Sequence, residues 1–118
     1  MVEIYQIHAT LQVLALLSLL IAAYGAKRHK LAIHHRSLYS ALALSTLAVA
    51  MNVYTYGGLP STHGRVGFSI YLFVLATALS GKLFLGGKLR RNQHRALAFI
   101  AIPAWALMIL YGLFTFVF

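Results

Sequence analysis

Cysteine is absent from the sequence, and acidic residues are nearly so, with Glu3 the single one. Without cysteine the chain cannot form disulfides, hold zinc or iron–sulfur clusters through thiolates, or use a thiol as a nucleophile. A single carboxylate excludes paired-acid catalysis and metal cages rich in carboxylates. Charged residues make up only 9% of the chain, against about 25% in soluble domains. The composition therefore predicts a membrane protein.

Long apolar runs are what the chain has in abundance, since 61% of its 118 residues are hydrophobic. A spanning helix needs about 20 apolar residues, because each residue rises about 1.5 Å across a hydrocarbon core of about 30 Å. Four runs qualify, and we expect helices over about 4–26, 33–56, 64–86 and 93–117 in a single domain of residues 1–118. Because the connections are short, consecutive helices should be antiparallel neighbours. The predicted fold is an all-α, four-helix transmembrane up-down bundle.

The ten lysine and arginine residues are distributed unevenly among the three connections and their flanks. The first and third connections hold nine of them, and the second holds only Arg65. Short cytoplasmic loops retain such residues, so we expect the first and third connections in the cytoplasm and both termini on the outer side. This predicts an integral protein of a prokaryotic-type cytoplasmic membrane. The net charge of +9 is then a topology signal and does not indicate nucleic-acid binding.

Histidine is the residue type left for chemistry, and one lies at or just inside the start of every predicted helix. A polar side chain in hydrocarbon is costly and usually faces the bundle interior. In an up-down bundle the first and third helices start outside, and the second and fourth start inside. His8 should therefore pair with His63 near the outer face, and His35 with His94 near the inner face.

Two facing imidazoles are the usual axial ligands of a low-spin haem iron. A bare metal ion would need further ligands within a helical turn of each histidine, yet no Asp or Glu follows any of them at three or four residues. The pattern predicts two b-type haems, with His8 and His63 on the outer iron and His35 and His94 on the inner iron. For any single histidine, a hydrogen-bonded interfacial side chain is the alternative interpretation.

The choice between His34 and His35 depends on an internal repeat. Each half of the chain reads as histidine, helix, basic connection, histidine, helix. The dipeptide His35-Arg36 matches His94-Arg95, which favours His35 as the inner ligand. Neighbouring positions point about 100° apart, so only one of the two can face a given cofactor. His34 shares a helix face with small residues and stays an alternative.

A macrocycle also needs space and partners for its propionates. Gly67 follows His63 by four residues and so shares its helix face without adding a side chain. Arg65 stands beside the outer pair, and Arg36 and Arg95 stand beside the inner pair. The sequence predicts these four residues as cofactor-binding, although cations near loops are more often topology determinants.

The four histidines resemble those of the cytochrome b561 family, whose core is a four-helix transmembrane unit with two b-type haems. The segment HGRVG at residues 63–67 is similar to that family's histidine followed four residues later by glycine. The resemblance covers nearly the whole chain and implies that helices one and three share one haem, and helices two and four the other. The chain departs from the eukaryotic members in having no flanking fifth and sixth helices and no convincing ascorbate motif.

A second resemblance is carried by the last helix and the start of the second. Its residues are His35-Arg36, His94-Arg95, Pro103, Trp105 and Gly112. They are similar to a family of small four-helix membrane proteins of formerly unknown function, which includes assembly factors for haem-copper oxidases. Members of that family tend to carry Asn where this chain has His8. His8 therefore favours two complete haem sites.

Together these features predict a transmembrane electron-transfer protein that oxidises quinol or another membrane reductant. Two histidines on each iron leave no position for oxygen, and no nicotinamide or flavin fingerprint is present. The pattern predicts no catalytic residue and leaves open whether the chain is a transmembrane oxidoreductase subunit. The alternatives are an oxidase-assembly or haem-handling factor and a cofactor-free anchoring subunit of a redox complex. A second copy of the chain and other redox subunits are candidate partners.

Overall fold

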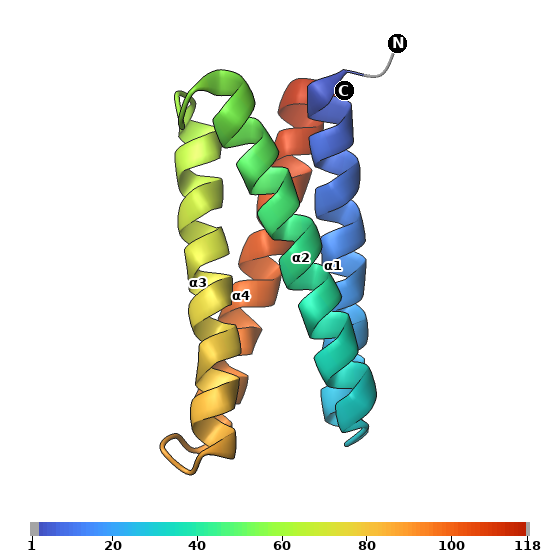
Figure 1. Cartoon of the computed structure of the whole chain (residues 1–118), viewed down its shortest axis with the longest axis vertical. Helices are drawn as coiled ribbons and strands as arrows, with labels where there is room; N and C mark the ends of the chain where they lie inside the picture. Colours follow the sequence, from blue (N-terminus) through green and yellow to red (C-terminus); the bar gives the residue numbers. More distant parts are fainter. Residues whose placement is uncertain (1–2, 118) are drawn as a thin grey trace.

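The computed structural model describes residues 3–117, with side chains to Thr115, as four long helices that run alternately up and down (Figure 1). They are α1 (Ile4–Lys27), α2 (Leu31–Tyr56), α3 (Thr62–Leu85) and α4 (Arg91–Gly112), and a π-helical turn, Leu113–Val117, continues α4. No strand occurs in residues 3–117. The prediction of an all-α chain with four helices is confirmed.

The ends of the helices follow from local chemistry. Gly57 ends α2 with a φ of 68°, a left-handed conformation that glycine adopts without steric cost. Ser61 begins α3, since its Oγ accepts a hydrogen bond of 2.9 Å from the backbone N–H of Gly64. Between α1 and α2 the tight turn places His29 at a φ of 57°. His29 is exposed there, outside the bundle.

Each of the four helices is long and apolar enough to cross a membrane. Their outward faces are apolar as well, because each helix carries large hydrophobic side chains that are at least half exposed. Examples, one from each helix, are Leu17 at 50%, Leu47 at 57%, Leu79 at 57% and Leu107 at 67%. A surface of this kind fits hydrocarbon and not water, so the coordinates are compatible with an integral membrane protein.

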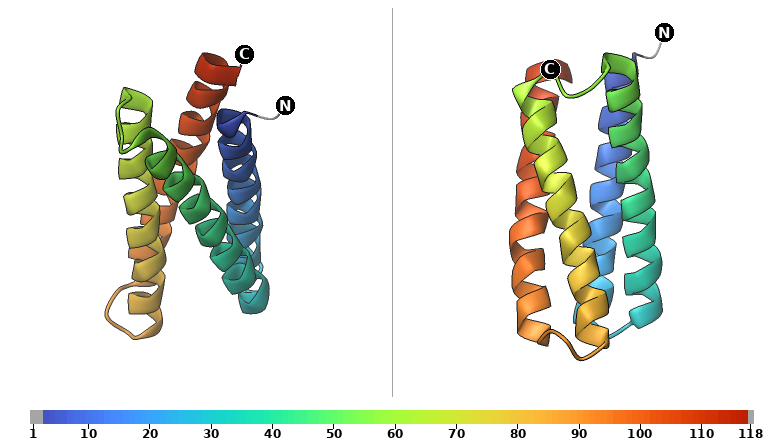
Figure 2. Two further views of the ribbon diagram at one scale, coloured as in Figure 1. Left: turned by 45° about the horizontal axis from the view of Figure 1, so that its top comes forward. Right: turned by 60° about the vertical axis from the view of Figure 1, so that its left-hand side comes forward.

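The helices form two hairpins of different closeness. In the first hairpin, α1 and α2 contact each other extensively, whereas α3 and α4 contact each other less. Figure 2 shows α2 running obliquely, from α3 at one end of the bundle toward α1 at the other. The two hairpins accordingly meet mainly through α1 and α4, and α2 touches α3 least.

Small residues explain the close contact within the first hairpin. Ala15, Ala22, Ala41 and Ala48 are each at most 1% exposed and lie on α1 and α2. At Gly25 an added Cβ would lie only 2.8 Å from the backbone nitrogen of His34. Small side chains allow helix backbones to approach closely, which favours van der Waals packing between helices in membranes.

Among the described residues, three side-chain hydrogen bonds join the hairpins, one of them the exposed bond of 3.4 Å between Arg91 Nη2 on α4 and His29 Nδ1 in the α1–α2 connection. The Trp105 indole on α4, which is 5% exposed, donates from Nε1 to Gln12 Oε1 on α1 at 3.0 Å. Thr46 Oγ1 on α2 and the Tyr71 hydroxyl on α3 lie 2.6 Å apart. Below, the His8 end is the end of the bundle that holds the α2–α3 connection, and the His94 end is the one that holds the two basic connections.

Candidate cofactor site

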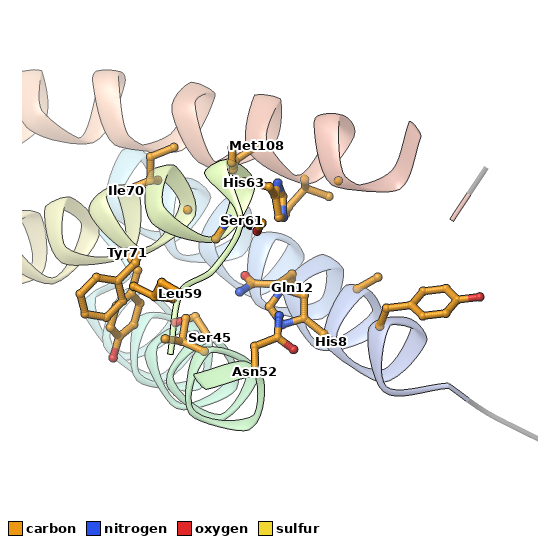
Figure 3. Close-up of a pocket in the computed structure, with 18 of the residues that line it drawn as sticks. His8, Gln12, Ser45, Asn52, Leu59, Ser61, His63, Ile70, Tyr71 and Met108 are labelled. Atoms are coloured by element: carbon orange, nitrogen blue, oxygen red, sulfur yellow. Dashed lines mark hydrogen bonds between the residues drawn. The ribbon is translucent and has the colours of Figure 1, made fainter. Parts of the chain in front are cut away.

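A cavity of about 330 Å³ lies at the His8 end (Figure 3). Residues from all four helices line it, among them His8 on α1 and His63 on α3. The two imidazoles lie close enough to interact electrostatically. Cofactor pockets usually measure about 300–1,000 Å³, so the cavity is at the lower end of that range. The structure thus brings together the two histidines that the sequence assigned to the outer pair.

His8 is fixed through its Nδ1 atom. Nδ1 lies 3.1 Å from the carbonyl oxygen of Ala48 on α2. A carbonyl oxygen only accepts hydrogen bonds, so the proton is on Nδ1, and Nε2 keeps its lone pair. Histidines that bind metals almost always donate their other ring N–H in this way.

His63 is fixed by two neighbours on α4. An added Cβ at Gly112 would lie 2.8 Å from His63 Cε1, so the ring lies directly against the glycine. The Tyr111 ring is stacked at 5.5 Å between centroids and 25° between planes. Only glycine at position 112 gives the ring this space without a shift.

The remainder of the cavity wall is apolar with a few polar groups. Gly67 is part of the wall, as expected for a residue that shares the face of His63, and an added Cβ would stand 3.9 Å from Met108 Cγ. Gln12, Ser45 and Asn52 supply polar atoms. Asn52 Oδ1 is buried and accepts no hydrogen bond from the residues that the structure describes. A buried acceptor of this kind is a place where a bound group could donate.

A second pair of histidines lies at the His94 end. His34 Nδ1 on α2 lies 2.8 Å from the carbonyl oxygen of Ala22 on α1. His94 Nδ1 on α4 lies 2.6 Å from Ser80 Oγ on α3. The two rings are near enough to interact electrostatically. In both residues Nδ1 is engaged by a neighbouring helix.

His35 has a different environment from His34. Its ring contacts the His34 ring at 5.4 Å and the Tyr39 ring at 6.5 Å, and both neighbours belong to its own helix. The His34 ring therefore faces α1, and the assignment of His35 or His34 as a ligand stays a prediction. His34 faces α1 because Gly25 lets α1 approach the backbone of α2 at His34, which turns the next position, about 100° around the helix, away from α1.

The repeat takes a definite structural form. Each histidine contacts the other helix of its own hairpin, at a small residue. The contacts are His8 with Ala48, His34 with Ala22, His63 with Gly112, and His94 with Gly81, where an added Cβ would lie 3.0 Å from His94 Cε1. Sequence reasoning did not identify Ala22, Ala48 and Gly81 in this role. The only signal for them was a small residue late in the facing helix.

The three arginines predicted beside the haems are all exposed. Arg65 Nε donates to the carbonyl of Leu59 at 3.0 Å, and Leu59 itself lines the cavity, whereas Arg65 is not among the described residues of the wall. The Arg95 guanidinium lies over the Phe99 ring at 5.3 Å. A role in binding propionates stays a prediction for Arg36, Arg65 and Arg95.

The donor set suits a group that brings its own equatorial ligands. Within residues 3–117 no three His, Cys, Asp or Glu side chains gather where they could hold a metal ion together. Each end of the bundle instead offers two imidazoles, and haem iron with four porphyrin nitrogens needs two axial ligands. At the His8 end the cavity lined by two imidazoles fits the donor set of a haem, and a haem at the His94 end stays a prediction.

No protein-family model, curated protein or solved structure matches this chain. The two resemblances described above therefore rest on the residues that carry them, and the function is argued from the site itself.

Proposed function

We propose that this protein is a transmembrane electron carrier that holds two b-type haems, one at each end of the bundle. The observation that carries the proposal is the cavity that His8 and His63 line together. At the other end, His34 and His94 are each held through Nδ1 by the facing helix of their hairpin. In three of these four residues Nδ1 is already engaged by protein, which leaves Nε2 as the donor.

The protein's own contribution is to position and shield the ligands. His8 and His63 would hold the haem near the α2–α3 connection, and His34 and His94 the one near the basic connections. Haem, when bound, supplies one-electron chemistry. Two histidines on each haem would leave no position for oxygen, so such a site would favour electron transfer. Apolar residues, among them Trp105 and Met108, line the cavity at the His8 end and would shield a haem there from water.

The proposal also includes the orientation of the protein in the membrane, its electron donor and its partner. Nine of its ten lysine and arginine residues stand at the His94 end, so that end would face the cytoplasm. The electron donor would be quinol or another membrane reductant, because the residues described form no large polar domain that could hold a soluble cofactor. A second copy or another redox subunit would be the partner.

The test is the haem content of the detergent-purified chain. We expect two haems per chain by pyridine haemochrome, with a reduced-minus-oxidised spectrum of b type. His8→Ala and His63→Ala should each abolish the same haem, and His34→Ala the other. His35→Ala should retain both. His29→Asn is the matched control, because His29 is exposed and Asn tolerates its left-handed backbone.

The other outcomes are equally informative. A colourless chain would reject the proposal and favour a cofactor-free anchoring subunit. Haem that is substoichiometric and exchanges readily would favour a haem-handling factor. Two haems that survive both His8→Ala and His34→Ala would reject these ligands.

A further inference from the structure

Ser80 on α3 has an unusual position for a serine in an apolar helix. It is only 4% exposed, and its Oγ makes two hydrogen bonds. One runs to the carbonyl oxygen of Thr77 at 2.5 Å, within α3, and the other to His94 Nδ1 on α4 at 2.6 Å. The second bond joins the two helices of the hairpin directly at a proposed haem ligand.

Counting hydrogens decides the direction of these bonds. A serine hydroxyl has one hydrogen to donate, whereas a carbonyl oxygen has none. The bond between Ser80 and Thr77 therefore uses the hydroxyl hydrogen. The bond between Ser80 and His94 must then use the hydrogen on Nδ1 of the ring. It follows that His94 is the tautomer whose Nε2 carries a lone pair.

Gly81, next to Ser80 on α3, also contacts the His94 ring. An added Cβ at Gly81 would lie 3.0 Å from His94 Cε1 and 3.4 Å from Nε2, so one side of the ring rests on α3 without an intervening side chain. Ser80 binds the edge of the ring while Gly81 supports it. Together they leave the ring little freedom to rotate.

His94 differs from the other two histidines that have a visible Nδ1 partner. His8 and His34 bond to backbone carbonyls of Ala48 and Ala22, which no substitution can remove. For His94 the acceptor at 2.6 Å is the Ser80 side chain, beside a contribution from the backbone carbonyl of Thr77. The tautomer and orientation of this ligand can therefore be changed by mutation without touching the ligand itself.

We propose that Ser80 is a positioning residue that holds His94 as its Nδ1–H tautomer, presents Nε2 to the haem at the His94 end and sets the electron-donating strength of that ligand. The electrochemical part rests on the proposed function. A hydrogen bond from Nδ1–H makes the imidazole a stronger donor and so favours ferric iron. Removal of the hydroxyl should therefore raise the reduction potential of one haem.

The first test compares Ser80→Ala with the wild-type full chain in a redox titration and by EPR. We expect the ratio of reduced to oxidised haem at the His94 end to rise about tenfold at a fixed potential, or about 59 mV for one electron. Its ferric g-values should change as well, while those of the other haem stay constant. Ser80→Thr keeps the hydroxyl and should restore both properties. Ser69→Ala is the control, because Ser69 also lies on α3 but bonds only to its own helix, at Arg65.

Several results would overturn the inference. Two bound haems with unchanged potentials and EPR spectra in Ser80→Ala would do so while leaving the proposed function intact. A shift in Ser80→Thr as large as that in Ser80→Ala would attribute the effect to packing. If Ser80→Ala does not fold, Ser80→Cys offers a side chain of similar shape with a weak acceptor and should shift in the same direction, whereas no shift would count against the proposal.

A second test does not depend on haem. If the wild-type chain contains none, the proposed function fails, but the tautomer of His94 can still be read from ¹⁵N NMR of labelled histidine in the same purified chain. We expect the Nδ1–H form in the wild type and in Ser69→Ala, and a mixture of tautomers in Ser80→Ala. An identical tautomer in all three proteins would overturn the role of Ser80.

Discussion

The two hairpins hold their histidine rings in place through different chemical groups. In α1–α2, His8 and His34 bond to main-chain oxygens across an interface of alanines. In α3–α4, His63 and His94 lie against glycines, and His94 bonds to a hydroxyl. The first hairpin therefore fixes its rings through backbone carbonyls. The second fixes them through the Ser80 hydroxyl and through glycines that leave space for the rings. This difference predicts that equivalent substitutions should affect stability in one hairpin and the cofactor in the other.

The largest loss of stability is expected from Gly25→Ala. Its Cβ would lie 2.8 Å from the backbone nitrogen of His34, and backbone cannot move aside as a side chain can. Overpacking of this kind costs about 1–3 kcal/mol. Unfolding in mixed SDS micelles would measure it. A stability equal to the wild type would show that α1 and α2 separate more easily than their contact suggests.

Gly112→Ala should act on the cofactor more than on the fold. Its Cβ would lie 2.8 Å from His63 Cε1, which belongs to a ring that can turn. We expect the haem at the His8 end to bind about 10-fold more weakly, with a smaller loss of stability than in Gly25→Ala. Haem transfer to an acceptor protein would measure the binding. Gly81→Ala is the milder counterpart at His94, where the distance is 3.0 Å. Equal haem retention in both variants and the wild type would remove the distinction between the hairpins.

Loss of the hydrogen bond between Trp105 and Gln12, which joins the hairpins, should reduce stability less than Gly25→Ala. Trp105→Phe removes the Nε1–H that donates to Gln12 Oε1 while keeping an aromatic side chain in the core. A buried hydrogen bond contributes about 1 kcal/mol, and its loss leaves Gln12 partly unsatisfied. Chemical unfolding would give the value, and the double variant with Gln12→Leu should cost less than the sum of the two single changes. Strict additivity would show that the two side chains do not interact.

The smallest effect is expected from Tyr71→Phe. Its hydroxyl pairs with Thr46 Oγ1 at 2.6 Å, but this bond is exposed and joins the helices that touch least. We expect at most about 0.5 kcal/mol, measured by the same unfolding experiment. A larger loss would mean that α2 and α3 depend on this bond to stay together.

The helices were predictable from the sequence, whereas the contacts of the histidine rings with the facing helices were not. Apolar runs of spanning length gave the four helices, and the starts of those runs placed the histidines at the two ends of the bundle. The contact of His34 with α1 depends on the rotation of α2 against α1, which is set by contact at Gly25. The matching His-Arg dipeptides pointed to His35, because a dipeptide carries no information about the facing helix.

The contact of Ser80 with His94 was beyond sequence reasoning for a related reason. The two residues lie on different helices, and their meeting depends on how far α3 and α4 slide and turn against each other. Gly67 was predictable because it shares one helix face with His63. The position of Arg65 was not, since its guanidinium is drawn to a loop carbonyl at Leu59.

The carbonyls of Ala48 and Ala22 have one more consequence. Every amino acid has the same main-chain carbonyl oxygen, so the sequence does not show which carbonyl accepts a hydrogen bond from a histidine. Distant proteins could keep this attachment while every neighbouring letter drifts, provided that the replacements stay small. An evolutionary relationship that preserves such contacts would be detected by structural superposition after sequence similarity had been lost.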